Sequence, residues 1–159
     1  MSTAATVRSR VEPAAAMVAV GVGAVVAGGL VAAVTSPLNL KSGSWLAAYL
    51  VLVVGVAQVV MGLARTYRGD SARGQGWVQL GGWNTGNVAV MTGALISHPW
   101  LVTAGSVLLL PAIGVAVAAL RWRDRTDPRP WWLTVYALLL VVLAVSIPIG
   151  IVLSYLRHG

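Results

Sequence analysis

Charged residues and cysteine are the residue types that this chain has little of or lacks. Only 9% of its 159 residues are Asp, Glu, Lys or Arg, whereas ordinary soluble domains contain about 25%. A soluble fold of this composition would have too few charged groups to cover its surface, so the composition predicts a membrane protein. The absence of cysteine excludes disulfides, thiolate metal sites and cysteine nucleophiles.

Acidic residues are scarce and lie outside the long apolar segments. The chain has four: Glu12, Asp70, Asp124 and Asp127. Carboxylate proton relays, cation sites and voltage sensors need ionisable groups inside the membrane, so we do not expect proton- or sodium-coupled transport by these means. The two histidines, His98 and His158, both fall at the predicted outer surface. We therefore expect no metal site and no cofactor, although an unidentified small ligand is compatible with the sequence.

Five apolar segments are long enough to cross a bilayer core, which needs about 20 residues per helix. These segments are residues 14–35, 45–64, 77–97, 101–120 and 131–156. Their short connections place consecutive helices antiparallel. The sequence therefore predicts an all-α, polytopic integral membrane protein whose five helices form a compact up-and-down bundle. Residues 14–156 form its single domain, and residues 1–13 and 157–159 form short tails.

Basic residues are distributed unequally between the two sides of this bundle. Nine of the eleven fall on the side of the N-terminus, and because basic loops stay in the cytoplasm the predicted topology is N-in, C-out. Seven of them are also predicted to contact anionic lipid or a cytoplasmic partner: Arg65, Arg68, Arg73, Arg121, Arg123, Arg125 and Arg129. The excess of Arg over Lys, with much Ala, Val and Gly, favours a bacterial inner membrane. Nucleic acid is not an expected partner.

Polar side chains interrupt the third apolar segment, which contains "GGWNTGNVAVMTGALIS" (residues 81–97). Trp83, Asn84 and Asn87 lie there, with Gln79 one turn earlier. At 1.5 Å rise per residue, Gln58 of the second segment lies at the same depth and is predicted to face Asn84 or Asn87. Two interpretations remain open. The amides either form structural hydrogen bonds between helices, or they line a small cavity for a neutral or amphipathic ligand.

Small residues lie at helical spacing in the same two segments. The third segment has Gly82, Gly86, Ala89 and Gly93 on one face, and the second has Ala48, Gly55, Gln58 and Gly62. Such faces let helix backbones approach closely, so the second and third segments are predicted to pack against each other. The third segment is then the central helix. Pro111 and Pro148 predict kinks in the fourth and fifth segments, with a gating hinge as the alternative.

No motif in the chain indicates a haem, quinone or nucleotide site, and no internal repeat of the transporter kind is present. Our first hypothesis is a non-enzymatic integral membrane protein that serves as an accessory or assembly subunit of a larger membrane complex. The alternative is a small-ligand-binding or channel-type membrane protein that works as a homo-oligomer around the polar cluster. An intramembrane enzyme is not expected. The predicted partners are membrane lipids and either other membrane subunits or further copies of this chain.

Overall fold

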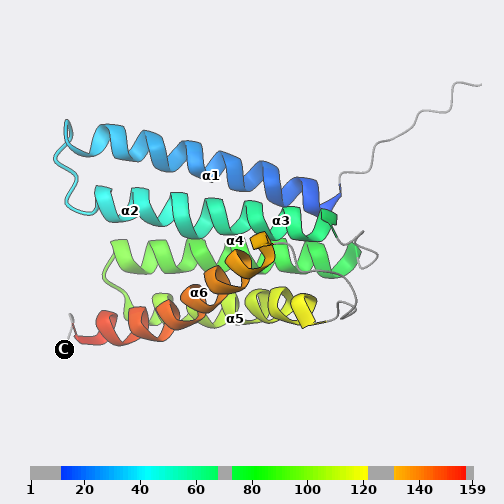
Figure 1. Ribbon diagram of the computed structural model, residues 1–159. Coiled ribbons are helices and arrows are strands. Elements are labelled where there is room, and N and C mark those ends of the chain that lie inside the picture. The colour runs from blue at the N-terminus through cyan, green and yellow to red at the C-terminus, as the bar shows by residue number, and fades with distance from the viewer. Residues whose placement is uncertain (1–11, 68–72, 122–130, 157–159) are drawn as a thin grey trace, which may run out of the picture.

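The computed structural model describes residues 12–67, 73–121 and 131–156, and all of its regular structure is helical (Figure 1). The elements are α1 (Pro13–Thr35), α2 (Gly43–Tyr49), η1 (Leu50–Val56), α3 (Ala57–Tyr67), α4 (Arg73–Leu95), α5 (Pro99–Arg121) and α6 (Trp131–Leu156). Elements α2, η1 and α3 follow one another without a break and form one continuous helix, called here the second rod. The predicted all-helical fold is confirmed, and α4 begins one turn earlier than predicted.

Three of the described helices are long and apolar enough to cross a membrane. They are Pro13–Thr35, the second rod (Gly43–Tyr67) and Pro99–Val117 within α5. Helix α4 is not among them, because its amides, glycines and tryptophans lower its hydropathy. In α6 the described side chains form a shorter apolar stretch, Ala137–Ser146. By their length and composition these helices support the predicted general class, a membrane protein.

Glycines join α1 to the second rod in a first helical hairpin. A Cβ on Gly21 would lie 2.9 Å from the carbonyl oxygen of Gly55, and a Cβ on Gly28 would lie 2.9 Å from the carbonyl oxygen of Ala47. At the other end of the same interface, a Cβ on Gly62 would lie 2.8 Å from the carbonyl oxygen of Ala14. Contacts this short require that glycine stand at each position, so the two backbones touch along most of their length.

A second hairpin, formed by α4 and α5, uses the same device. A Cβ on Gly86 would lie 2.9 Å from the carbonyl oxygen of Gly105, and a Cβ on Gly93 would lie 2.7 Å from the amide nitrogen of Val102. Gly82 lies farther from α5, with Leu108 as its nearest neighbour at 3.9 Å. The expected packing of the second-segment and third-segment glycines against each other is therefore wrong. Each stripe instead packs on the other neighbour in sequence, α1 or α5.

The turn between α4 and α5 explains how the second hairpin closes over only three residues. Ser97 has a left-handed backbone (φ 57°), and the amide of His98 donates a 2.8 Å hydrogen bond to the carbonyl of Gly93. This is the Schellman arrangement that ends many helices. Pro99 then occupies the first turn of α5, where its missing N–H costs nothing.

The winding of the second rod changes the angular position of its residues. Element η1 is π-helical, and the amide of Ala57 donates to the carbonyl of Leu52, five residues earlier. A count of 100° per residue therefore fails across η1. The uniform count of 100° per residue predicted that Ala48 lies on the glycine face. In the structure Ala47 is buried and Ala48 is exposed. The sequence contains no signal for this winding.

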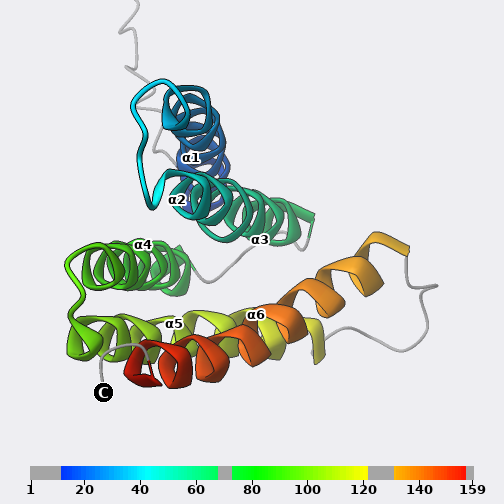
Figure 2. The same cartoon turned by 90° about the vertical axis from the view of Figure 1, so that its left-hand side faces the viewer.

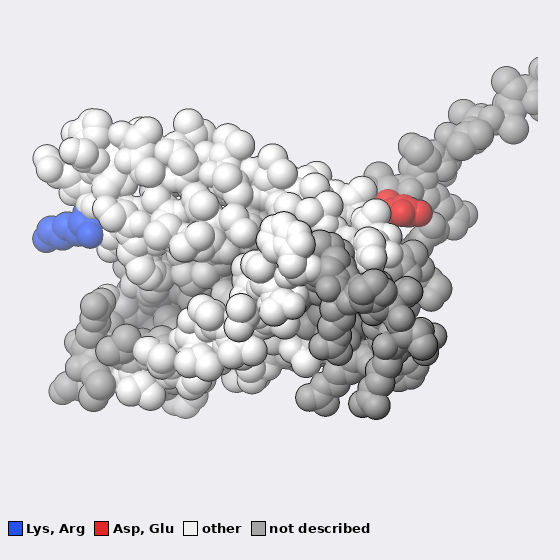
Figure 3. All heavy atoms as spheres, in the orientation of Figure 1, with Lys and Arg blue, Asp and Glu red and all other residues white. Residues whose placement is uncertain are grey.

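Helix α6 crosses the other helices obliquely and packs on α5 (Figures 1 and 2). Among its described side chains Leu140 is buried and most others are exposed. Helices α5 and α6 continue through Pro111 and Pro148 without interruption. Figure 3 shows charged side chains at the two ends of one face and an uncharged surface between them. Exposed apolar side chains of this kind suit a hydrocarbon environment.

A matched pair of substitutions in α5 tests the close contact between hairpin helices. A Cβ on Gly105 would lie 2.6 Å from the carbonyl oxygen of Gly86, whereas one on Gly114 would meet no described atom within 4 Å. We expect Gly105→Ala to lower the free energy of unfolding by about 1–3 kcal/mol through overpacking. Gly114→Ala should stay within about 0.5 kcal/mol of the parent protein. Thermal unfolding in mild detergent measures both, and equal unfolding temperatures for the two variants would contradict the packing.

Candidate functional site

Polar side chains gather between the two hairpins. A buried glycine also lies there, because a Cβ on Gly76 of α4 would lie 2.6 Å from the Pro13 ring of α1. Gln58, Gln79, Trp83 and Asn87 are all buried, with exposed fractions of 0%, 3%, 0% and 0%. These four belong to the five predicted cluster residues, and the fifth, Asn84, is only half-buried. With Tyr49 and Arg65, which contact them, the four buried residues are called here the inter-hairpin layer. The structure thus brings together most of the cluster that the sequence indicates.

Asn87 is paired with a residue that sequence reasoning missed. The Tyr49 hydroxyl donates a 2.9 Å hydrogen bond to Asn87 Oδ1, and Asn87 Nδ2 donates a 2.8 Å hydrogen bond to the carbonyl of Trp83. The Tyr49 ring also lies against Trp45, with ring centroids 5.3 Å apart. This pair ties the start of the second rod to α4. Tyr49 lies within the predicted second segment but was not singled out there.

Gln79 connects three helices. Its Oε1 accepts a 2.8 Å hydrogen bond from Arg65 of α3, and its Nε2 donates to the carbonyl of Ala112 in α5 at 3.2 Å. The same Nε2 lies 3.7 Å from the sulfur of Met61. Arg65 was predicted to contact lipid or a partner. Here its half-buried guanidinium makes a charge-assisted bond to an amide, which is stronger than a neutral one.

Asn84 does not take part in the inter-hairpin layer. Its Nδ2 donates a 2.8 Å hydrogen bond to the carbonyl of Leu80, four residues earlier in α4. Because this hydrogen bond lies within α4, it does not link Asn84 to another helix. The predicted pairing of Gln58 with Asn84 or Asn87 is therefore wrong, because Asn84 bonds within α4 and Asn87 is occupied by Tyr49.

Gln58 and Trp83 are left without hydrogen-bond partners. Gln58 Nε2, Gln58 Oε1 and Trp83 Nε1 are buried and make no hydrogen bond within the described part of the chain. Most buried polar atoms in proteins have a partner, and each orphan costs about 1–3 kcal/mol of desolvation. Three orphan atoms in one layer are the most unusual feature of the molecule.

Contacts between the second rod and α4 flank Gln58 and Trp83. Gln79 meets Met61 of α3, and one turn beyond Trp83 in the other direction Asn87 meets the start of the second rod. Because the second rod and α4 run in opposite directions (Figure 1), the positions between these contacts face each other. Gln58 and Trp83 both lie in that interval. Along their own helices, Gln58 lies three residues before Met61 and Trp83 lies four residues before Asn87.

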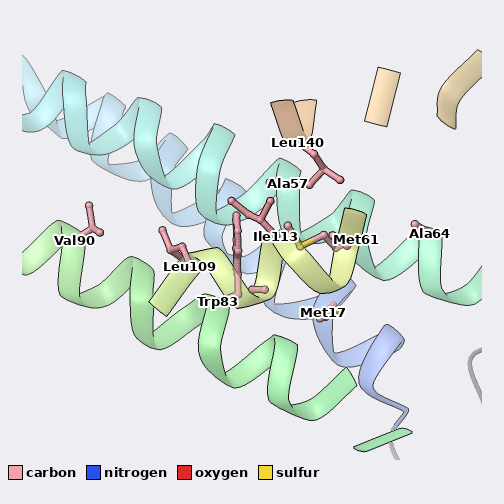
Figure 4. Close-up of a cluster of buried hydrophobic side chains, with 11 residues drawn as sticks. Met17, Ala57, Met61, Ala64, Trp83, Val90, Leu109, Ile113 and Leu140 are labelled. Atoms are coloured by element: carbon pink, nitrogen blue, oxygen red, sulfur yellow. The ribbon is translucent and has the colours of Figure 1, made fainter. Parts of the chain in front are cut away.

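Apolar side chains surround Trp83. Figure 4 shows its ring within a buried cluster that includes Leu109 and Ile113 of α5, Ala57 and Met61 of α3, and Leu140 of α6. Groups of three or more His, Cys, Asp or Glu able to hold a metal are absent among the described residues. Around Trp83 the layer therefore offers hydrogen bonding inside an apolar shell, and its charged member, Arg65, is bonded to Gln79.

The remaining predicted contact residues lie at helix ends or beyond the described part of the chain. Arg73 begins α4 and Arg121 ends α5, and nothing is described of their side chains. Arg68, Arg123, Arg125 and Arg129 lie outside the described residues. The predicted arginine contacts with anionic lipid or a partner therefore stay predictions.

A double-mutant cycle tests whether the tie between Tyr49 and Asn87 holds the hairpins together. We expect Tyr49→Phe to lower the free energy of unfolding by about 1 kcal/mol, because Asn87 Oδ1 loses its donor. Combined with Asn87→Leu, the coupling should be about 0.6–1.7 kcal/mol, as for other hydrogen bonds between membrane helices. Tyr49→Phe with Asn84→Leu is the matched control and should be additive. Unfolding in detergent measures both cycles, and equal coupling in both would refute the tie.

Gln58→Leu has the opposite expected effect on stability. It removes two orphan atoms and leaves an apolar side chain of similar size, an exchange that is neutral or stabilising when no partner is lost. We therefore expect an unfolding temperature equal to or above that of the parent protein in ligand-free detergent solution. Asn87→Leu, which removes a buried amide that is hydrogen-bonded, should lower it. A Gln58→Leu protein as unstable as the Asn87→Leu protein would mean that Gln58 has a protein partner.

Comparison of the chain with protein-family models, with curated proteins and with solved structures finds no match in any of the three. These comparisons therefore give no function that could be transferred to this chain. What it does has to be argued from two features of its own structure: the inter-hairpin layer and the outer face of α4.

Proposed function

We propose that this chain is a non-enzymatic integral membrane protein that serves as an accessory or assembly subunit of a larger membrane complex. All five helices would span the membrane, with the N-terminus in the cytoplasm and the C-terminus outside. The bacterial inner membrane is the proposed location. The distribution of basic residues supports this orientation, and the three long apolar helices support membrane insertion.

The outer face of α4 is the observation that carries the proposal. This face consists of exposed residues at helical spacing: Gly74, Val78, Gly81, Thr85, Val88 and Thr92. A Cβ on Gly81 would meet no described atom within 4 Å, so its glycine is not required by any packing inside the described structure. Small residues and hydroxyl groups on a membrane helix favour a neighbouring helix over lipid.

The position of α4 in the fold makes this exposure informative. One of its other faces packs against α5 and another contributes to the inter-hairpin layer. Helix α4 is also not among the helices that are apolar enough to cross a membrane. Gly81, Thr85 and Thr92 point outward from a helix of low hydropathy, so contact with another helix would be more favourable for them than contact with lipid. A helix of another subunit would supply that cover, and close contact at Gly81 would let the two backbones approach.

The alternative function, binding of a small ligand by a homo-oligomer, has a different observation in its favour. Trp83 Nε1 and the Gln58 amide have no hydrogen-bond partner within the described residues, and Trp83 lies on the other side of α4, since position 81 is about 160° from position 83 at 100° per residue. The two functions therefore depend on separate faces of one helix and do not exclude each other.

Purification from the native membrane tests the accessory role. We expect stoichiometric partner proteins to co-purify in mild detergent and Gly81→Leu to reduce their recovery at least fivefold, because a leucine side chain would hold the partner helix away. Mass spectrometry of the purified complex measures the recovery.

Gly23→Leu is the matched control for this experiment. Gly23 is an exposed glycine of α1 whose Cβ would also meet no described atom within 4 Å. This variant should retain the partners while changing surface volume by the same amount. Equal loss in both variants would remove the special role of α4. A homo-oligomer without other proteins would overturn the accessory role itself.

A further inference from the structure

The contacts inside each hairpin differ in kind from the contacts between the hairpins. Inside the hairpins the helix backbones touch, at Gly21 against Gly55 and at Gly86 against Gly105. Between the hairpins, which Figure 2 shows as two units, the described contacts are made mostly by side chains. Close-packed elements move together as rigid bodies. The surface between the hairpins is therefore the place where this fold can move without breaking its backbone contacts.

One end of this surface is held tightly. Where α1 and α4 begin, a Cβ on Gly76 would lie 2.6 Å from the Pro13 ring and 3.0 Å from the Arg65 guanidinium. Arg65 also donates a hydrogen bond to Gln79, and Gln79 donates one to the carbonyl of Ala112 in α5. Close packing and hydrogen bonds that run through three helices thus fix this end, which is called here the tight end.

The opposite end, where α4 finishes, is held by the hydrogen bond from the Tyr49 hydroxyl to Asn87 Oδ1. Ala94 lies seven residues after Asn87 on the same face of α4, and it is exposed. On the second rod, Trp45 lies one turn before Tyr49 and is also exposed. The Tyr49–Asn87 bond therefore lies at the rim of the contact between the hairpins. This bond is called here the latch, and this end of the bundle the latch end.

A buried group next to the latch makes the closed arrangement less stable. Trp83 lies one turn from Asn87 toward the tight end, and its buried Nε1 has no hydrogen-bond partner within the described part of the chain. Its ring belongs to the cluster that Ala57 and Met61 of the second rod also join (Figure 4). An unpaired buried donor costs free energy that is regained when water reaches it. A wider separation at the latch end is therefore favourable for this indole, and the latch opposes it.

We propose that the two hairpins swing apart at the latch end about the contacts of the tight end, and that the Tyr49–Asn87 bond holds them closed. Helices α4 and α5 move as one body, and α6, which packs on α5, moves with them. The second rod moves with α1. The movement separates side chains and keeps every glycine contact within the hairpins. Opening uncovers Asn87 first and Trp83 next. This device goes beyond the proposed accessory role and does not depend on it.

Distances between spin labels on the two hairpins measure this movement. Because the chain has no cysteine, each introduced cysteine is a unique site for a nitroxide label. The pair for the latch end is Ala33 of α1 and Ala104 of α5, both exposed. The pair toward the tight end is Ala15 of α1 and Gly114 of α5, also exposed. For the full chain in lipid nanodiscs, pulsed electron double resonance should give two distances for the first pair and one for the second.

Loss of the latch should shift the balance between the closed and open forms. Tyr49→Phe and Asn87→Leu each remove the bond, so the ratio of open to closed form at the latch end should rise about threefold to twentyfold, the range for one hydrogen bond between membrane helices. The distance at the tight end should not change. Asn84→Leu is the matched control, because that amide bonds within α4, and it should leave both distances at their parent values. Unfolding temperatures show that each labelled variant is folded.

The outcomes separate a latched movement from its alternatives. A longer distance at the latch end that appears only in the two latch variants supports the proposal, because the bond then holds the parent protein closed. A latch-end distance that neither variant lengthens would overturn it. Lengthening at both ends together would mean that the hairpins separate as a whole, and an equal response to Asn84→Leu would remove the role of the latch. None of these results depends on whether Gly81→Leu releases partner proteins.

Discussion

Backbone contact at glycine is the interaction on which the rest of this structure depends. Gly21 against Gly55, and Gly86 against Gly105, bring two pairs of helices to distances at which a single Cβ would clash. In lipid there is no hydrophobic force between helices, so van der Waals packing of this kind must hold them. Most of the close glycine contacts lie within the hairpins, and apart from Gly76 against Pro13 larger side chains occupy the surface between them. The polar layer lies there because there the helices are held apart.

The helices were predictable from composition, and their partners were not. Runs of apolar residues define the five helices within a few residues, because length and hydropathy are local properties. The glycine stripes of the second and third segments were also recognisable as packing faces. Which neighbour each stripe would meet depends on competition between α1, α4 and α5, since every connection is short. A row of glycines on one helix face predicts that another helix packs closely there, but it does not determine which helix that is.

The candidate site shows the same division between local and non-local information. Four of its buried residues were identified because polar side chains in an apolar run require explanation. Tyr49 was not among the predicted site residues, and its hydrogen bond to Asn87 depends on how the second rod packs against α4. Asn84 was included because it lies three residues from Asn87, but its amide bonds to Leu80. Sequence position gave the depth of these residues, and the hydrogen-bond partners followed only from the packing.

Helix α4 carries different chemistry on each of its faces, and this links its stability to its function. The glycine face against α5 is fully used. The face toward the second rod is used in part, since Asn87 and Gln79 are bonded while Gln58 and Trp83 are not. A chain under selection for stability alone would replace Gln58 with an apolar residue, because unpaired buried amides destabilise a fold. Local features that cost stability persist where they serve another purpose. Within the described structure, the unpaired amide of Gln58 and indole of Trp83 are thus the polar groups of the inter-hairpin layer whose presence internal hydrogen bonding does not account for.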